Sequence, residues 1–181
     1  MKKGLLAILL SASVGTAAAA TYSLDPNHTN ARFAADHHET STNVGGFFKL
    51  DGKLQFDPAK KTGAVDVVIP ISKLNSGNPD FDQHLKTADF FHAEKFPEMR
   101  FVSDEFVFDG DKVKEVRGKL TILGQTHPVT LQAKQFNCYF NDMAKKDTCG
   151  GDFTAKIQPT QWGFAAPKEA KLKIQIEAFK D

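Results

Sequence analysis

Tryptophan, tyrosine, cysteine and long apolar runs are scarce in this chain. Its 181 residues include one Trp, two Tyr and two Cys, against 16 Phe. The longest strongly apolar stretch, residues 5–10, is far shorter than the roughly 20 residues that a membrane-spanning helix needs. Basic and acidic residues number 23 and 22, and without a Lys/Arg cluster the chain lacks the basic surface of a nucleic-acid-binding protein. These features argue against a membrane span and against a nucleic-acid partner.

The first twenty residues have the three parts of a secretory signal. Lys2 and Lys3 precede the apolar run, and four alanines end at Ala20, ahead of the polar Thr21. A basic start, a short apolar stretch and small residues at a cleavage site are the features of a cleavable signal peptide. The sequence therefore predicts a signal peptide over residues 1–20, export, and one mature domain over residues 21–181.

Cys138 and Cys149 are expected to form a disulfide. An exported protein meets an oxidising compartment, in which such a pair stays bonded. Closing a loop of about a dozen residues stabilises a fold by roughly 2–3 kcal/mol in the chain-entropy treatment. A redox-active pair is the alternative, although such pairs are usually spaced C-x-x-C.

Apolar and polar residues alternate along most of the mature chain, as in strands with one buried face. Strands of this kind are expected over residues 30–38, 44–57, 65–71, 98–109, 112–123, 127–137, 152–159 and 171–178. Antiparallel strands in this number form a barrel or a sandwich. Ten-residue strands span about 33 Å, which favours the barrel. An eight-stranded barrel has room for its own side chains or for one slim ligand.

One segment has helical features instead. Asn78 and Pro79 supply a cap and a suitable first helical residue, and Phe81 and Leu85 fall on one face. We therefore expect an all-β fold with a short helical segment around residues 80–91.

The motif search gives no specific support for catalysis. No Gly-x-Ser-x-Gly turn, phosphate loop or dinucleotide fingerprint occurs. The series His37-His38-Glu39 and the pair Asp82-x-His84 contain metal-ligand types, but neither spacing is a recognised metal signature. Adjacent strand residues also point to opposite faces. We expect neither an enzyme nor a metal site.

The excess of Phe has two explanations. Phe brings no hydrogen-bonding group to a wall, which suits an apolar ligand. An ordinary large core also needs bulky apolar residues. The composition leaves both explanations open.

Several motifs of the mature chain together match the signature of a known protein family. The most specific is N-P-D-F-D-Q-H-L-K-T-A-D-F-F over residues 78–91, followed by Phe96-Pro97 and Phe101. The others, in chain order, are Tyr22-x-x-Asp25-x-x-His28, G-G-F-F-x-x-x-G from residue 45, G-x-L-T-I-x-G from residue 118, and Trp162-Gly163. In this order the motifs resemble the signature of the YceI-like family of exported polyisoprenoid-binding proteins. Thr29 stands where the family usually has serine, and the Cys pair is not part of the family pattern.

This resemblance covers essentially all of residues 21–181 and implies a lipocalin-like barrel of eight antiparallel strands. Its lumen would hold an isoprenoid lipid, such as a quinone or its precursor, in the periplasm, for transport or storage. The resemblance implies no catalytic apparatus and no cofactor besides the bound lipid, and it suggests a homodimer and transient membrane contact. Two alternatives stay open: a stress-related structural or interaction protein with a solid core, and a metal-dependent hydrolase.

An apolar lumen binds a prenyl chain through burial, at about 0.8 kcal/mol for each methylene-sized group, so specificity would lie at the mouth. The strand and helix positions expected to line it are Phe33, Phe48, Phe56, Val67, Ile69, Phe81, Leu85, Phe90, Phe101, Ile122 and Leu131. Asp82, His84 and Asp89 would either fix the helix to the barrel or contact a polar headgroup. A register error of one residue would exchange lumen and outside.

Overall fold

The computed structural model describes residues 19–181, so the predicted signal peptide lies outside the described residues except for its last two. The described chain is mostly strand, with one α-helix and two 3-10 helices. The strands are β1 (Ala20–Leu24), β2 (Asn30–His37), β3 (Ser41–Phe48), β4 (Asp51–Asp57), β5 (Thr62–Pro70), β6 (Leu74–Asn75), β7 (Glu98–Asp109), β8 (Lys112–Ile122), β9 (Gln125–Asn141), β10 (Lys146–Ile157) and β11 (Ala170–Lys180). The helices are η1 (Ile71–Lys73), α1 (Pro79–Lys86) and η2 (Pro159–Trp162).

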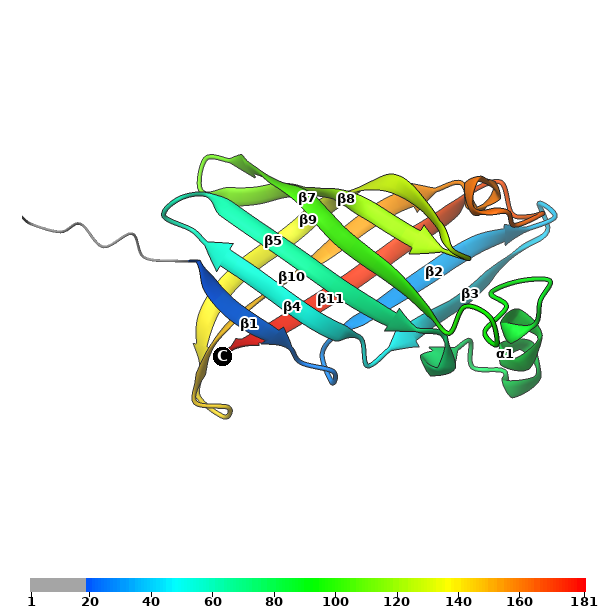
Figure 1. Ribbon diagram of the computed structural model, residues 1–181, viewed down its shortest axis with the longest axis horizontal. Helices are drawn as coiled ribbons and strands as arrows, with labels where there is room; N and C mark the ends of the chain where they lie inside the picture. Colours follow the sequence, from blue (N-terminus) through cyan, green and yellow to red (C-terminus); the bar gives the residue numbers. More distant parts are fainter. Residues whose placement is uncertain (1–18) are drawn as a thin grey trace, which may run out of the picture.

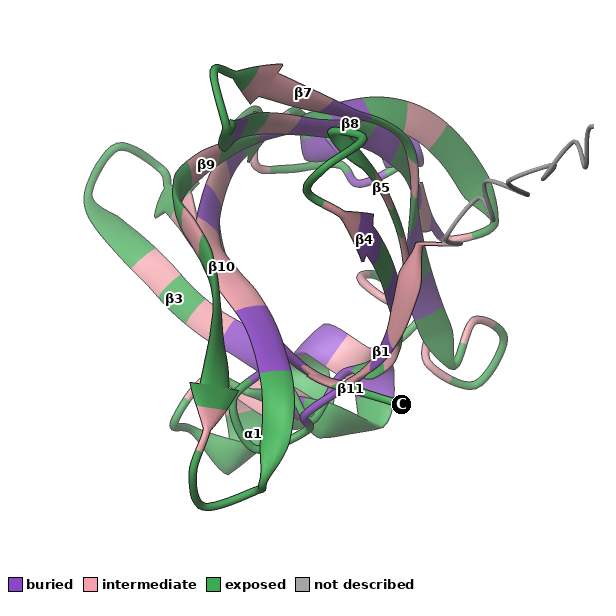
Figure 2. Cartoon of the chain, turned by 90° about the vertical axis from the view of Figure 1, so that its left-hand side faces the viewer, coloured by how far each residue is buried: buried purple, intermediate pink, exposed green. Residues whose placement is uncertain are grey.

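The strands close into one antiparallel barrel (Figure 1). Around one end the order is β1–β4–β5–β7–β8–β9–β10–β11, and β11 pairs again with β1. Toward the other end β2 replaces β1 beside β11, and β3 pairs with β2 and with β6. The pairs β1/β2, β3/β4 and β5/β6 therefore act as three bent strands. The predicted eight-stranded barrel is confirmed, and Figure 2, which looks along it, shows the ring of strands.

Three local features differ from the expected boundaries. Strand β1 precedes the first expected strand, which was placed from residue 30. The segment expected as one strand from residue 44 to 57 is divided into β3 and β4, because Lys49 between them has a left-handed conformation, φ 55°. The hairpin of β9 and β10 is longer than expected and reaches the turn after Asn141. Cys138 and Cys149 lie opposite each other in this hairpin and form the expected disulfide.

Helix α1 forms where its capping residues predict it. The Asn78 side chain accepts hydrogen bonds from the N–H groups of Asp80 and Phe81, and Pro79 occupies the first turn. The helix ends at Lys86, and the rest of the expected helical segment, as far as Phe91, consists of turns. In Figure 1 this segment lies at the right-hand end of the barrel, below β3.

Hydrogen bonds to β11 hold the bend between β1 and β2. The Asp25 N–H donates to the Glu177 carbonyl over 2.8 Å. The Thr29 hydroxyl donates to the same carbonyl over 3.1 Å and accepts from the Glu177 N–H over 3.2 Å. Asp25 and Thr29 are both buried. These bonds replace ladder bonds that the strand loses at its bend.

His28 adds an ion pair to this bend. Its Nδ1 lies 2.6 Å from the Asp25 carboxylate and 3.6 Å from that of Glu177. The hydrogen bond to Asp25 is the main cause that raises the pKa of His28 above its ordinary value. Burial opposes this shift, and the Asp25 and Glu177 charges add lesser contributions that raise the pKa. A group whose pKa is higher in the folded state than in the unfolded state stabilises the fold when it is protonated. This stabilisation is complete at pH values below the unfolded-state pKa, and it is lost as the pH rises through the folded-state pKa.

We therefore expect His28→Asn to lower the melting temperature by a few degrees at pH 5.5 and by clearly less at pH 8.5. The asparagine amide can still donate to Asp25 but carries no charge. Thermal unfolding monitored by circular dichroism at both pH values measures the difference. His38→Asn, in the exposed β2–β3 turn, is the matched control. An equal loss for His28→Asn at both pH values would contradict the role of the charge.

Candidate functional site

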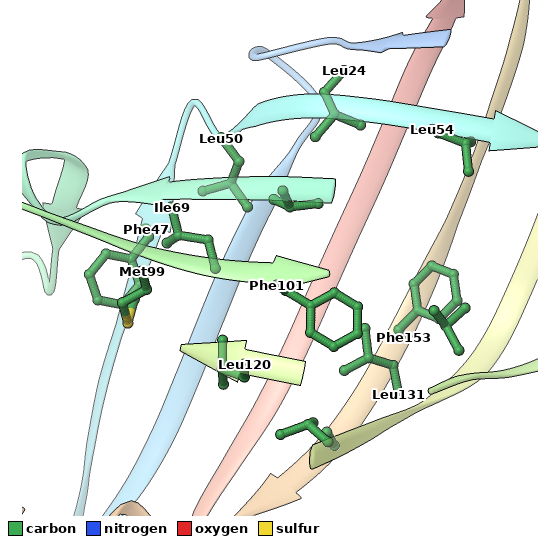
Figure 3. Close-up of a cluster of buried hydrophobic side chains, with 14 of the residues drawn as sticks. Leu24, Phe47, Leu50, Leu54, Ile69, Met99, Phe101, Leu120, Leu131 and Phe153 are labelled. Atoms are coloured by element: carbon green, nitrogen blue, oxygen red, sulfur yellow. The ribbon is translucent and has the colours of Figure 1, made fainter. Parts of the chain in front are cut away.

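An apolar cavity of about 900 Å³ lies inside the barrel. Its walls are built by strand alternation, since every second residue of a strand points inward. Side chains from several strands converge on the interior, among them Leu50 of the β3–β4 connection, Phe101 of β7 and Leu131 of β9 (Figure 3). The volume is near the upper end of the roughly 300–1,000 Å³ of small-molecule sites.

Aromatic rings close one end of the cavity. Phe106 and Phe136 line it, while Phe56 packs behind them, with ring centroids 6.4 and 4.9 Å away. Phe108 stacks on Phe56 at 6.2 Å. Among the described residues, none from the turns at this end, at the left in Figure 1, lines the cavity. The cavity is therefore a pocket with one closed end.

The polar lining is confined to the other end, which we call the mouth. Every polar residue that lines the cavity belongs to the β2–β3 hairpin, to α1 or to the loop before β11. These residues are Arg32, Asp36, His37, His38, Glu39, Asn43, His84, Lys168 and Glu169. The rest of the lining is apolar, so the cavity is matched to a long apolar molecule with one polar end.

The α1 segment and the loop around η2 cover the mouth. The Phe91 ring meets the rings of Phe47 and Phe164 edge-on, each at 5.3 Å. Leu85 of α1 is buried and lines the cavity. Behind Phe164, the Trp162 indole N–H donates to the Leu120 carbonyl over 3.0 Å. These contacts join the cover to strands on both sides of the barrel.

The structure places most predicted lumen residues on the cavity wall. Those that line it are Phe33, Val67, Ile69, Phe81, Leu85, Phe90, Phe101, Ile122 and Leu131. Their contact with a ligand stays a prediction.

Two predicted wall residues lie elsewhere. Phe48 faces outward and is 39% exposed, whereas its neighbour Phe47 is buried and lines the cavity. Because both adjacent residues are phenylalanines, the apolar pattern did not indicate which of them faces inward. The predicted register of this strand was therefore wrong by one residue. Phe56 does face the interior, but it lies beneath the cavity floor.

The three predicted polar residues have different positions. The Asp82 carboxylate accepts a hydrogen bond from the Ser76 N–H over 2.7 Å, which ties α1 to the preceding loop. His84 lines the mouth, with its ring 4.8 Å from that of Phe90. Asp89 is exposed and does not line the cavity. Of the three, only His84 can reach a bound headgroup.

Some lining residues and one side-chain cluster were not predicted. Phe47, Phe91 and Phe164 line the cavity. Phe47 and Phe91 lie within motifs of the family resemblance, whereas the abundance of Phe was the only signal for Phe164. One carboxylate oxygen each of Asp25 and Glu177 and a ring nitrogen of His28 lie within 4.8 Å of one another. Atoms this close together could hold a metal ion. The Asp25–His28 hydrogen bond, the His28–Glu177 ion pair and the bond that Asp25 accepts from the Asn27 N–H explain the cluster as a clasp that holds the β1–β2 bend.

The comparisons with known proteins agree with this fold and cavity. The YceI-like domain matches residues 22–178. The chain belongs to the YceI-like family. It is 36% identical to a UPF0312 protein of Vibrio cholerae over 179 residues, which are 96% of this chain and 87% of the relative.

Solved YceI-like structures share the barrel. The Campylobacter jejuni YCEI protein superposes with a TM-score of 0.71 at 27% identity, over 81% of this chain and 90% of that one. A polyisoprenoid binding domain from Saccharophagus degradans superposes with a TM-score of 0.66 at 11% identity, over 88% and 98% of the two chains. At that identity the second likeness concerns the fold alone. In residues 19–181, no helix of this YceI-like protein has the length and apolar character to cross a bilayer.

Proposed function

We propose that this YceI-like protein is a periplasmic binding protein that holds an isoprenoid lipid in its barrel for transport or storage. The lipid would be a polyisoprenoid, a quinone or a quinone precursor. The observation that carries the proposal is the division of the cavity into a long apolar part and a polar mouth. The polyisoprenoid binding domain of Saccharophagus degradans, with the same fold, adds support.

The cavity argues against the alternative of a solid core. Packed interiors leave few voids larger than a water molecule, whereas the cavity that opens at the mouth of this barrel has a volume of about 900 Å³. Its apolar walls offer a polar ligand no hydrogen bonds along most of their length. A prenyl chain needs none and gains about 0.8 kcal/mol for each buried methylene-sized group.

The proposed location follows from the predicted signal peptide. An isoprenoid chain is insoluble in an aqueous compartment, and a barrel that covers it would carry or store it there. The aromatic floor and the cover over the mouth would shield the chain from water on all sides.

Titration of the delipidated mature protein with a long-chain quinone tests the proposal. Trp162 is the single tryptophan, and it lies next to the cavity-lining residues Pro159 and Phe164. We expect saturable one-to-one quenching of its fluorescence. The same quinone ring without its prenyl tail is the control and should bind at least about a hundredfold more weakly, since about four buried methylene-sized groups already account for that factor. Equal binding of both compounds, or no saturable quenching, would contradict the proposal.

A further inference from the structure

We propose that the mouth selects isoprenoid lipids with an uncharged headgroup, such as a quinone, phenol or alcohol, and discriminates against a prenyl diphosphate. This inference rests on the proposed function, because it concerns the polar end of the lipid whose chain would fill the barrel. It is carried by three features of the mouth: its charges, its helix terminus and its uncharged polar side chains.

The charges at the mouth do not favour an anion. The cations that border the cavity are Arg32 and Lys168, and the carboxylates are Asp36, Glu39 and Glu169. The Arg32 side chain packs over Gly46 beside the outward-facing Phe48, so Lys168 is the cation nearer the opening. The Glu169 carboxylate also forms an ion pair with Lys156, whose Nζ lies 3.3 Å away and which does not line the cavity. A diphosphate carries at least two negative charges, so it would meet more carboxylates than cations in a partly enclosed site.

The two cations are also poorly placed to act together. Arg32 lies three residues along β2 from Ala35, roughly 10 Å of strand. Ala35 pairs with Ala170, and Lys168 lies beyond that pair, on the side away from Arg32. Anion sites for phosphate groups usually place cationic side chains and backbone N–H groups around one point. The backbone positions of Arg32 and Lys168 are separated instead of facing one point.

The helix terminus at the mouth is already capped. The Asn78 side chain accepts hydrogen bonds from the Asp80 and Phe81 N–H groups over 3.0 and 3.3 Å. Asp80 and Asp82 add negative charge to this first turn. A helix N-terminus attracts a phosphate through free N–H groups and a positive potential, and both are reduced here.

The remaining polar side chains fit an uncharged group. His37, His38, His84 and Asn43 all line the mouth. Neutral imidazole and carboxamide groups each contain a donor and an acceptor. They come from the β2–β3 hairpin and from α1, two parts of the chain that border the same opening. A ketone or hydroxyl oxygen placed between them can accept or donate without bringing charge into the mouth.

A binding comparison of three probes tests this inference. A prenyl quinone, a prenyl alcohol and a prenyl diphosphate of one chain length are titrated into delipidated wild-type protein at low ionic strength. We expect the diphosphate to bind at least tenfold more weakly than the alcohol. Diphosphate binding as tight as alcohol binding would overturn the headgroup inference and leave the lipid-binding proposal standing. If no probe binds, the proposed function fails and the inference fails with it.

A charge variant at the mouth provides a second readout. Glu39→Gln, in the exposed β2–β3 turn, removes one lining carboxylate. The ratio of diphosphate affinity to alcohol affinity should rise roughly two- to fivefold, as expected for one charge at a solvated site. Asp111→Asn, an exposed carboxylate in the β7–β8 turn at the opposite end of the barrel, should leave the ratio unchanged. An unchanged ratio in Glu39→Gln would overturn the electrostatic basis of the selection.

Discussion

Replacing Ala31 with tryptophan should strongly reduce lipid binding while the barrel stays folded. Ala31 lies on β2, between Phe47 and Ile174 of the neighbouring strands, and it lines the cavity. An indole at this position would displace several methylene-sized groups of a bound chain. Each is worth about 0.8 kcal/mol, so affinity should fall by more than about tenfold. Quinone titration and lipid content after purification measure the loss.

The same strand offers a matched control. Ala34 lies three residues further along β2, with Lys171 and Val44 as its cross-strand neighbours, and it does not line the cavity. Ala34→Trp should bind lipid as the wild type does, with a similar melting temperature to Ala31→Trp. Wild-type lipid content in Ala31→Trp, or an equal loss in Ala34→Trp, would show that the lumen is not the binding site.

Among single substitutions in the cover, removal of the Trp162 side chain should lower the free energy of unfolding the most. The residue is 1% exposed, its indole N–H donates to the Leu120 carbonyl, and its ring meets His127 edge-on at 5.1 Å. Truncation of a buried aromatic residue to alanine typically costs 3–5 kcal/mol. Urea unfolding of Trp162→Ala, followed by circular dichroism, measures this change in the free energy of unfolding.

Two further variants separate the contributions at this site. Trp162→Phe keeps a ring but leaves the Leu120 carbonyl without its donor, so it should cost about 1–3 kcal/mol. Phe140→Ala removes a ring that is 55% exposed on the β9–β10 hairpin. It should change stability by about 0.5 kcal/mol or less. A loss below about 1 kcal/mol in Trp162→Ala would contradict the role of Trp162 in anchoring the cover.

The sequence predicts the features of this fold that depend on local pattern. Strand alternation, with its period of two, indicates the eight strand positions, and Asn78-Pro79 marks the start of α1. The pairing of Cys138 with Cys149 follows from export and from their short separation. These signals are local, so they do not depend on how the barrel closes.

The mouth could not be predicted in the same way. It is assembled by barrel closure, which brings the β2–β3 turn, α1 and the loop before β11 to one end of the molecule. His37 and His38 showed no recognisable site pattern when considered alone, whereas the structure places both on the rim of an apolar cavity. The clasp joins Asp25 and His28, near one end of the described chain, to Glu177 near the other end, and no local pattern relates Glu177 to the other two residues.

The choice between Phe47 and Phe48 shows a second limit. The G-G-F-F segment contains apolar residues at both consecutive positions, so alternation does not select a face. The pairing of Phe47 with Ala31 on one side and with Leu74 on the other fixes it inward. Pairing across strands is decided by the whole sheet rather than by the segment itself.

Native mass spectrometry of the mature protein, purified without detergent from a quinone-producing bacterium, tests the central claim most directly. We expect the protein to carry one prenyl lipid that dissociates in the gas phase and that solvent extraction recovers for identification. Ala31→Trp, purified in parallel, should carry much less of it. A wild-type protein that shows only its own mass, and that also fails to bind added quinone, would contradict the claim that the barrel is a lipid-binding site.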